Sequence, residues 1–338
     1  MPVVKPDELR ELVARIYVAN GVSDAEAEVV SRHQVGANLA GHDSHGVMRT
    51  PQYVSAIKRG DIVPGAEFVI ERETPSTAVI NANWGFGFVM TERAMNLAIA
   101  KAVAQGGAGV TIRFQGHVGR LGAYAGMAAD RGLIAMMMSD SGRGPKLTVP
   151  FGGNTALLGS NPICIAVPSS RHGAVILDMA TSAVALGKVQ LARQRGEAIP
   201  LGWVVDKDGQ PTTDPEAYWE GGALLPLGGD QGHKGYGLSF MVEVFCGLLT
   251  GLGYGVAADG KHNDGNFIAV HDVSCFMDPD VFRNQVSDFV DYLKAGAAEG
   301  SEVLYPGEHE QRTAEERSRD GIYVEDKTWD ALQALEQA

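Results

Sequence analysis

The hydrophobic positions at the start of the chain recur every three to four residues, which is the period of an α-helix with one buried face. Apolar side chains follow this spacing over residues 9–17, and Asn20-Gly21 provides a stop signal. A capping box opens a second predicted helix over residues 23–39, which ends near Gly41. A third helix is predicted over residues 49–60. The N-terminal segment is therefore expected to be helical.

From about Thr74 the pattern changes to short apolar runs separated by glycine-rich turns, which is typical of strands. Strands are predicted within residues 76–87, 108–113, 132–140, 161–168, 174–180 and 202–213, the last folded as a hairpin around an Asp-Gly turn. Helices are predicted over residues 88–105, 117–131 after an initial loop, 235–251, from 280 onward and 328–335. The helix over 235–251 is so apolar that we expect it to be fully buried.

This order of elements predicts a mixed α+β fold. Residues 1–73 and 280–338 are expected to pack together as a helical domain built from both termini, and residues 74–279 to form a sheet domain. We find no internal repeat and no low-complexity segment.

Charge and composition narrow the classes of partner. The formal net charge is −13 and the isoelectric point is about 5.1, so the surface repels phosphate backbones and anionic lipids. Nucleic-acid and membrane partners are therefore not expected, and an anionic small substrate needs a local basic site. The three cysteines make no metal-binding spacing or disulfide framework. With neither a signal peptide nor an apolar run of about 18 residues, a cytoplasmic location is predicted.

The stretch "GHDSHGVMR", residues 41–49, gathers acid–base and anion-binding side chains. An imidazole at His45 can move a proton near neutral pH, and the Arg49 guanidinium can grip a carboxylate with two parallel hydrogen bonds. The alternative is that His42 and Asp43 cap a helix and that His45 is an ordinary loop histidine. Neighbouring side chains point in different directions, so a nucleophile–base pair of Ser44 and His45 is not expected. The stretch also lacks a G-x-S-x-G elbow.

Three further stretches carry candidate chemistry, each with a plainer alternative. "GHVGRLGAY" at residues 116–124 brings His117 and three glycines to a predicted helix start, where N–H groups hold phosphates, but it is also a simple turn. Asp178 closes an apolar strand, where it either supports an imidazolium or caps a helix. Lys234 lies between glycines in "GHKGYG" and suits a phosphate or ribose contact, or a solvated loop. "LYPGE" at residues 304–308 can be a simple turn.

Two familiar signatures are missing from the sequence. No G-x-G-x-x-G opens a helix after a strand with an acidic residue about 20 positions on, so the Rossmann fingerprint is absent. The histidines and cysteines make neither HExxH nor a cysteine cluster, so no metal site is expected.

Taken together, the motifs resemble a known family. "NLAGHDSHGVMR", "HVGRLGAY", "FGGNTALLGSNPICIAVP", "LDMATSAVALGK", "GHKGYGL" and "LYPGE" occur in this order along the chain. The sequence is similar, over roughly residues 8–335, to the malate/L-lactate dehydrogenase family of the second, non-Rossmann type. Its members include hydroxycarboxylate, ureidoglycolate, sulfolactate and diketogulonate dehydrogenases and Δ1-piperideine-2-carboxylate reductases. The resemblance implies a homodimer, NAD or NADP as cofactor, and residues 74–279 as a cofactor-binding domain on a largely antiparallel sheet.

The resemblance also implies roles for individual residues. His45 matches the family's acid–base histidine, with Ser44 and Asp178 as relay partners, and His117 is a second candidate for the proton acceptor. Arg49, Tyr53 and His117 match substrate-binding positions. The implied cofactor contacts are His117, Val118, Gly119, Arg120, Leu121, Pro168, Ser169, Ser170, Thr181, His233, Lys234, Tyr305, Pro306 and Gly307.

The predicted function is reversible hydride transfer between NAD(P) and C2 of a small 2-hydroxy or 2-oxo acid. Reduction of a cyclic imine 2-carboxylate stays open, because the same carboxylate clamp and proton donor would serve it. A metal- or serine-dependent hydrolase and a non-catalytic dimeric binding protein are alternatives of other classes. The sequence leaves open which acid is used and whether NAD or NADP is preferred.

Overall fold

The computed structural model describes residues 2–140, 142–256 and 264–337. The chain divides into two compact units, each described by itself. Unit 1 comprises Met1–Met137, Cys164–Asp178 and Ile268–Ala338, and unit 2 comprises Met138–Ile163 and Met179–Phe267. Unit 1 thus holds the terminal helices together with most of the sheet. The predicted division into a helical domain and a cofactor-binding domain is a statement about function and stays a prediction.

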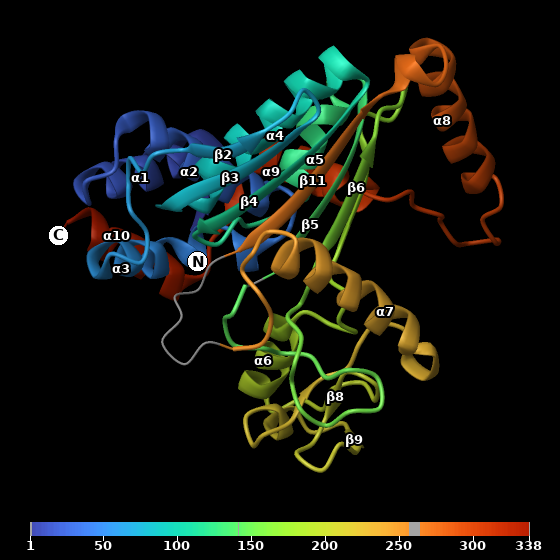
Figure 1. Cartoon of the computed structure of the whole chain (residues 1–338). Helices are drawn as coiled ribbons and strands as arrows, with labels where there is room; N and C mark the ends of the chain where they lie inside the picture. The colour runs from blue at the N-terminus through green and yellow to red at the C-terminus, as the bar shows by residue number, and fades with distance from the viewer. Residues whose placement is uncertain (1, 141, 257–263, 338) are drawn as a thin grey trace. The chain divides into compact units, whose positions relative to one another are not determined.

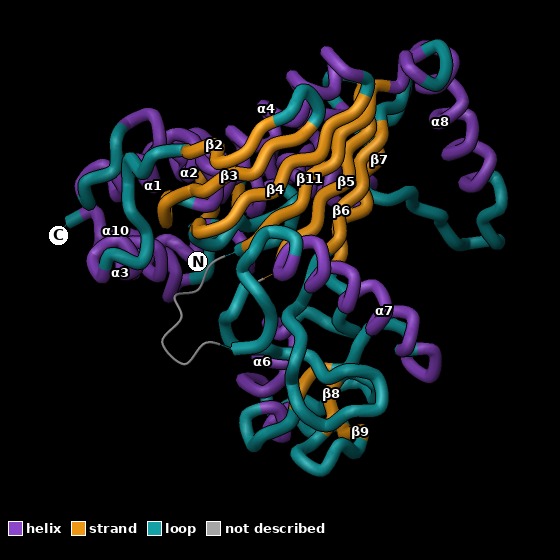
Figure 2. Tube along the Cα trace, viewed as in Figure 1, coloured by secondary structure: helices purple, strands orange, loops and turns teal. Residues whose placement is uncertain are grey.

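A seven-stranded mixed sheet forms the centre of the fold (Figure 2). Its spatial order is β2 (Val69–Glu73), β3 (Thr77–Gly85), β4 (Gly107–Gln115), β11 (Gly265–Asp272), β5 (Leu133–Asp140), β6 (Ile163–Val167) and β7 (Val175–Met179). The β2–β3 pair is antiparallel and the β3–β4 pair is parallel. A strand from late in the chain, β11, lies between β4 and β5, which is not a doubly wound order. The predicted α+β, non-Rossmann fold is confirmed.

The main core lies between this sheet and two helices, α4 (Gly87–Gln105) and α5 (Gly122–Ala129). Side chains of alternate sheet positions, such as Ile80 and Ile112, meet Met95 of α4 and are fully buried. Burying each such side chain contributes about 1.5–3 kcal/mol. This packing fixes the loops at the ends of β4 and β6, where several candidate residues lie.

The two terminal segments of the chain lie together in unit 1. Helices α1 (Pro6–Ala19), α2 (Asp24–Leu39), α3 (Thr50–Arg59) and α10 (Asp326–Glu336) gather around a second core at one end of the sheet (Figure 1). The short strands β1 (Val3–Val4) and β12 (Ile322–Tyr323) pair antiparallel beside them. Helix α9 (Glu308–Asp320) packs against α2. The capping box is half formed: Ser23 Oγ accepts from Glu26 N, while the Glu26 carboxylate accepts from Gly65 N at 2.8 Å.

Unit 2 is built from short elements. They are α6 (Leu186–Arg195), β8 (Val204–Val205), β9 (Pro211–Thr212), β10 (Ala223–Leu224), α7 (His233–Val242) and a π-helical turn, Glu243–Leu248. The predicted Asp-Gly hairpin is confirmed by the antiparallel register of β8 and β9, with the turn glycine Gly209 at φ +80°. Five 3₁₀ turns complete the described chain: Asp43–His45, Val47–Arg49, Pro215–Tyr218, Gly229–Gln231 and Val273–Cys275.

The prediction that the helix over residues 235–251 is fully buried is wrong. Helix α7 buries only its small or slender side, including Ser239 and Val242, while Phe240 and Met241 remain about half exposed. Helix α8 (Pro279–Lys294) lies at the end of the sheet opposite α1 and α10 (Figure 1), with Phe289 exposed. The high apolar content of α7 indicated a position in the core. Composition alone does not show whether residues of the same chain pack over an apolar helix face. No helix among the described residues is long and apolar enough to cross a membrane.

Candidate active site

The stretch that follows α2 folds into two consecutive 3₁₀ turns, and the Asn38 side chain holds both of them. Asn38 Nδ2 donates to Asp43 Oδ1 at 2.6 Å, and Asn38 Oδ1 accepts from Val47 N at 2.9 Å. Gly46 lies against this amide so closely that a Cβ there would meet Asn38 Oδ1 at 2.2 Å. One buried amide therefore sets the path of the backbone on either side of Ser44 and His45.

Polar side chains from other elements anchor the same stretch. Arg317 of α9 donates from Nη1 and Nη2 to the two carboxylate oxygens of Asp43 at 2.7 and 3.1 Å. Gln34 Nε2 donates to Gly46 O, and His42 Nε2 lies 3.3 Å from Glu310 Oε1. Sequence reasoning missed these supports. Gln34 and the buried Asn38 stand four residues apart on one helix face, which was a detectable signal, whereas Arg317 carried none.

His45 is partly buried and hydrogen-bonded to its neighbour. Ser44 Oγ lies 2.9 Å from His45 Nδ1. The expectation that these adjacent side chains diverge is wrong, because the tight 3₁₀ turn brings them to the same side. The contact involves Nδ1 of the imidazole.

A second imidazole stacks beside the first. The rings of His45 and His117 have centroids 5.6 Å apart and planes inclined by 28°. Tyr53 of α3, which is 2% exposed, places its hydroxyl 2.7 Å from His117 Nδ1. Phe88 meets Tyr53 edge-on at 5.6 Å and fixes the phenol ring. The structure therefore brings His45, His117 and Tyr53 together.

Arg49 joins this group through the backbone. Its Nε donates to Ser44 O at 2.8 Å and its Nη1 donates to Gln52 Oε1 at 2.8 Å. The Nε contact orients the guanidinium relative to the His45 turn. A carboxylate can then be met by the edge that carries the two Nη atoms.

Asp178 at the end of β7 caps a helix, although not its own. Its Oδ2 accepts from Gly122 N, the first residue of α5, at 2.7 Å, and lies 3.9 Å from Arg120 Nε. Burial raises the pKa of Asp178 above its ordinary value, although the Gly122 bond and the charges of Arg120 and His42 oppose the shift. Asp178 therefore caps a helix, as one of the two interpretations predicted, but the helix is α5, which precedes Asp178 in the sequence. The N-terminus of α5, which was predicted to hold a phosphate, already donates a backbone hydrogen bond to this carboxylate. A relay role for Asp178 stays a prediction.

Three of the predicted cofactor segments lie in unit 1. Residues 117–121 follow β4, with Gly119 at φ +73° against Phe88, and residues 168–170 follow β6. The turn at 305–307 lies beside β7, where Ile176 N donates to Pro306 O at 2.9 Å. Tyr305 Oη donates to His172 O, which ties this turn to the loop after β6.

The remaining predicted contacts lie in unit 2. Thr181 is buried and donates its hydroxyl to Asn161 O at 3.0 Å. His233 and Lys234 are exposed at the first turn of α7, where backbone N–H groups and positive charge coincide.

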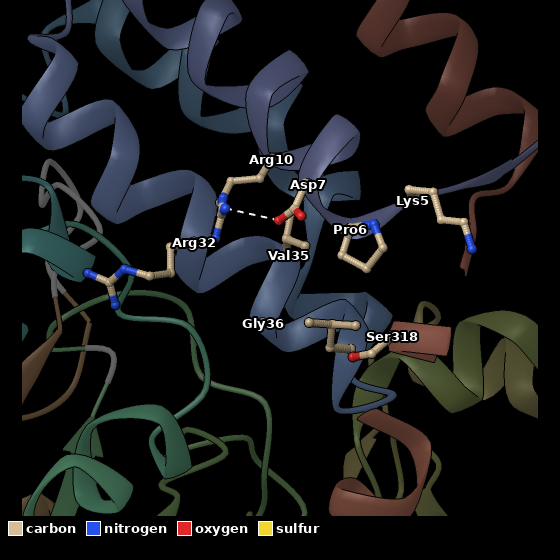
Figure 3. Close-up of a pocket in the computed structure, with 9 residues that line it drawn as sticks. Lys5, Pro6, Asp7, Arg10, Arg32, Val35, Gly36 and Ser318 are labelled. Carbon is tan, nitrogen blue, oxygen red and sulfur yellow. Dashed lines mark hydrogen bonds and ion pairs between the residues drawn. The ribbon is translucent and has the colours of Figure 1, made fainter. Parts of the chain in front are cut away.

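A cavity of about 530 Å³ lies in unit 1 between α1, α2 and α9 (Figure 3), and none of the predicted site residues lines it. Arg10 and Asp7 pair with each other there at 2.9 Å. Within the described ranges, no cluster of three or more histidine, cysteine, aspartate or glutamate side chains could hold a metal ion.

Comparisons with known proteins found matches along nearly the whole chain. The family model of malate/L-lactate dehydrogenase matches residues 4–333. The L-sulfolactate dehydrogenase of Methanothermobacter thermautotrophicus is 38% identical over 330 residues, 96% of this chain and 93% of that protein. The Δ1-pyrroline-2-carboxylate/Δ1-piperideine-2-carboxylate reductase of Pseudomonas putida is 33% identical over 334 residues, 97% of this chain and 95% of that protein.

A solved structure shows the same fold. The malate dehydrogenase of Pyrococcus horikoshii superposes with a TM-score of 0.90 at 33% identity, covering 99% of this chain and 95% of that one. Family, fold and enzyme class predicted from the sequence are confirmed. The chain belongs to the malate/L-lactate dehydrogenase family and is an oxidoreductase of that family.

Proposed function

We propose that the chain catalyses reversible hydride transfer between NAD or NADP and C2 of a small 2-hydroxy or 2-oxo acid. The observation that carries this proposal is the stacked His45–His117 pair with Arg49 and Tyr53 on the adjoining turn and helix. Such a group offers a proton donor, a hydrogen-bond donor and a carboxylate clamp within one unit. The sulfolactate and malate dehydrogenases among the relatives support an α-hydroxy acid as substrate.

Arg49 holds the substrate carboxylate. The bond from Nε to Ser44 O keeps the guanidinium beside the His45 turn, so binding the carboxylate also places C2 near the imidazole. A guanidinium fork fixes direction as well as position, which a lysine ammonium cannot do. The acidic chain, at −13, makes this local positive charge necessary for an anionic substrate.

His45 gives the proton to the carbonyl oxygen in reduction and takes it back in oxidation. Ser44 Oγ lies 2.9 Å from Nδ1. We assign Nδ1–H as the donor of this bond in both protonation states, which makes the proton on Nε2 the one exchanged. The relay predicted for Ser44 and Asp178 would extend this bond: the serine hydroxyl donates to a carboxylate and stabilises the imidazolium.

His117 polarises the substrate while remaining neutral. Tyr53 donates its hydroxyl proton to Nδ1, which fixes the tautomer that carries hydrogen on Nε2. Two imidazolium ions stacked at 5.6 Å would repel each other, so protonation of His45 favours a neutral His117. The pair then divides the work between one proton donor and one hydrogen-bond donor.

The chain's own residues fit a dinucleotide. When bound, the nicotinamide would supply or accept the hydride. In unit 1, residues 117–121 after β4 and the turn at 305–307 beside β7 would contact the cofactor. In unit 2, His233 and Lys234 at the start of α7 suit a phosphate. We propose these residues, with 168–170 and Thr181, as those that hold NAD or NADP.

A second candidate is NADPH-dependent reduction of a cyclic imine 2-carboxylate. The similarity to the Pseudomonas putida reductase supports it, because the clamp and the proton donor would be the same. A hydrolase and a non-catalytic binding protein have no comparable support. We also propose a homodimer, since the half-exposed Phe240 and Met241 of α7 are better explained by a second copy than by solvent. A cytoplasmic location and the lack of nucleic-acid partners stay predictions.

A substrate panel tests the proposed function. Purified protein is mixed with NADH or NADPH and with pyruvate, oxaloacetate, sulfopyruvate, and the two cyclic imine carboxylates, and absorbance of the reduced cofactor is followed. Turnover with oxoacids supports the main proposal, and turnover with imines alone supports the second candidate. No turnover with any pair, together with intact folding, would refute both.

A further inference from the structure

We propose that His33 and Glu92 act as a positioning pair that sets the spacing of the two active-site imidazoles. His33 lies on α2 and Glu92 on α4, and His33 Nε2 is 2.7 Å from Glu92 Oε2. The inference deepens the proposed function and rests on it for the roles of His45 and His117.

Helix α2 carries the side chains that anchor the His45 turn. Gln34 and Asn38 follow His33 on this helix and bond to Gly46 O, Asp43 and Val47 N. Any displacement of α2 therefore displaces the turn that presents His45.

The first residue of α4, Gly87, lies against the His117 backbone. A Cβ on Gly87 would stand 2.1 Å from Gly116 O and 2.4 Å from His117 O. The backbones are packed so closely here that a shift at the start of α4 would also shift His117. The His33–Glu92 pair joins these two helices directly.

The His33 ring stacks with two aromatic rings, those of Tyr124 and Phe88. The ring lies nearly parallel to Tyr124 at 4.8 Å and to Phe88 at 5.7 Å. Tyr124 Oη donates to Val118 O at 2.6 Å, and Phe88 fills the space against Gly119. His33 thus touches both side chains that support the segment after His117.

The His33–Glu92 pair is mostly buried, and the Arg32 guanidinium lies beside it. His33 is 4% exposed at its side chain and Glu92 is 19% exposed. The His33 bond and the Arg32 guanidinium, which donates to both Glu92 oxygens, lower the pKa of Glu92. A buried, directional bond between two helices holds their separation more firmly than apolar contact alone.

The test compares variants that break or keep this bond. His33→Phe keeps a flat ring in the stack but loses the bond, Glu92→Ala removes the partner, and Glu92→Gln keeps an acceptor for Nε2–H. Arg15→Met is the matched control, because it removes an ion pair to Glu336 between two other helices, α1 and α10. Steady-state kinetics, pH profiles, melting temperatures and imidazole NMR resonances of His45 and His117 are measured for each.

We expect His33→Phe and Glu92→Ala to lower kcat about 10–100-fold with little change in KM, and to shift the imidazole resonances and the pH profile. Glu92→Gln should recover most of the rate, and Arg15→Met should change the melting temperature alone. Unchanged kcat and resonances in a folded Glu92→Ala protein would overturn the inference, as would equal losses in Gln and Ala variants. If the wild-type enzyme turns over no substrate, the proposed function fails, and the resonances still decide the positioning role.

Discussion

The Tyr53 hydroxyl lies 2.7 Å from His117 Nδ1, and the His117 ring also stacks on His45 with the ring centroids 5.6 Å apart. A phenol from α3 thus contacts a ring nitrogen of an imidazole that follows β4, although 64 residues separate the two in sequence. In the proposed mechanism this bond sets His117 apart from His45, which the resemblance favours for the acid–base role, with His117 as the second candidate.

Tyr53→Phe tests that distinction. Removing the hydroxyl frees Nδ1 and lets His117 adopt either tautomer, so we expect kcat to fall about tenfold with the fold unchanged. The pH dependence of kcat should also change shape, because His117 can then be protonated in competition with His45. A profile and rate identical to the wild type would show that Tyr53 serves packing only.

His45→Ala removes the proposed proton donor. The expected loss in kcat is about 10²–10⁴-fold, which is the usual contribution of a positioned general acid. Cofactor binding, followed by fluorescence of the reduced nicotinamide, should be largely retained. If turnover survives within a few-fold, His117 is the better candidate for the proton donor, and His117→Ala in parallel decides between them.

Arg49→Lys replaces the carboxylate fork by a point charge. We expect KM for the acid to rise about 10–100-fold with a smaller loss in kcat. Arg59→Lys is the matched control, since Arg59 ends α3, the helix that follows Arg49, and bonds to Asp61 and Ser55. Equal kinetics for the Arg49 and Arg59 variants would remove Arg49 from the binding site.

Helical periodicity predicted the long elements of the fold well. Helices α1, α2, α3 and α4 appear where apolar spacing and stop signals placed them. Strand β2 was missed because its sequence, "VIERE", is polar and partly exposed at the sheet edge, with no alternation to detect. Helix α6 was missed because only Val189 is buried.

The candidate site was predictable in its residues but not in its supports. Short sequence motifs indicated His45, Arg49 and His117 as candidates, because functional side chains often occur in compact local signatures. The supports act over long sequence separations: Arg317 reaches Asp43 across 274 positions. Such contacts depend on how helices pack, which the local pattern does not encode.

Arg317→Met tests the importance of that distant support. It leaves the carboxylate of Asp43 without its two guanidinium bonds, so we expect the His45 turn to loosen and kcat to fall about tenfold. Arg317→Lys should recover part of the rate. Arg319→Met on the same helix removes only an exposed pair with Asp320 and should leave kcat unchanged. A fall in melting temperature without any fall in kcat would contradict the expected role.

Unit 2 contains a buried ion cluster, which we expect to make the stability of the protein depend on pH. Lys146 Nζ donates to Asp140 Oδ1 at 3.1 Å and to Glu243 Oε1 at 3.0 Å, and the Lys146 and Asp140 side chains are almost fully buried. Asp140 Oδ2 has no hydrogen-bond partner in the part of the chain that the structure describes. One lysine therefore faces two carboxylates, with Asp264 and Cys246 nearby.

Burial, followed by repulsion from Glu243, raises the pKa of Asp140 to about 7, against the attraction of Lys146. The folded state then holds a proton that the unfolded chain releases, so stability falls as pH rises from the unfolded value toward 7 and levels off above it. Between pH 6 and pH 8 the expected loss from this group is about 1.4 kcal/mol.

Asp140→Asn should remove this dependence, because an amide needs no proton and offers N–H groups where Oδ2 lies. The free energy of unfolding is measured by urea denaturation at pH 6, 7 and 8 for the wild type, for Asp140→Asn and for Asp208→Asn, an exposed carboxylate in the β8–β9 turn. The difference between Asp140→Asn and wild type should grow in favour of the variant as pH rises. A difference that stays constant over this range would show that Asp140 is ionised throughout, with Lys146 outweighing the cost of burial.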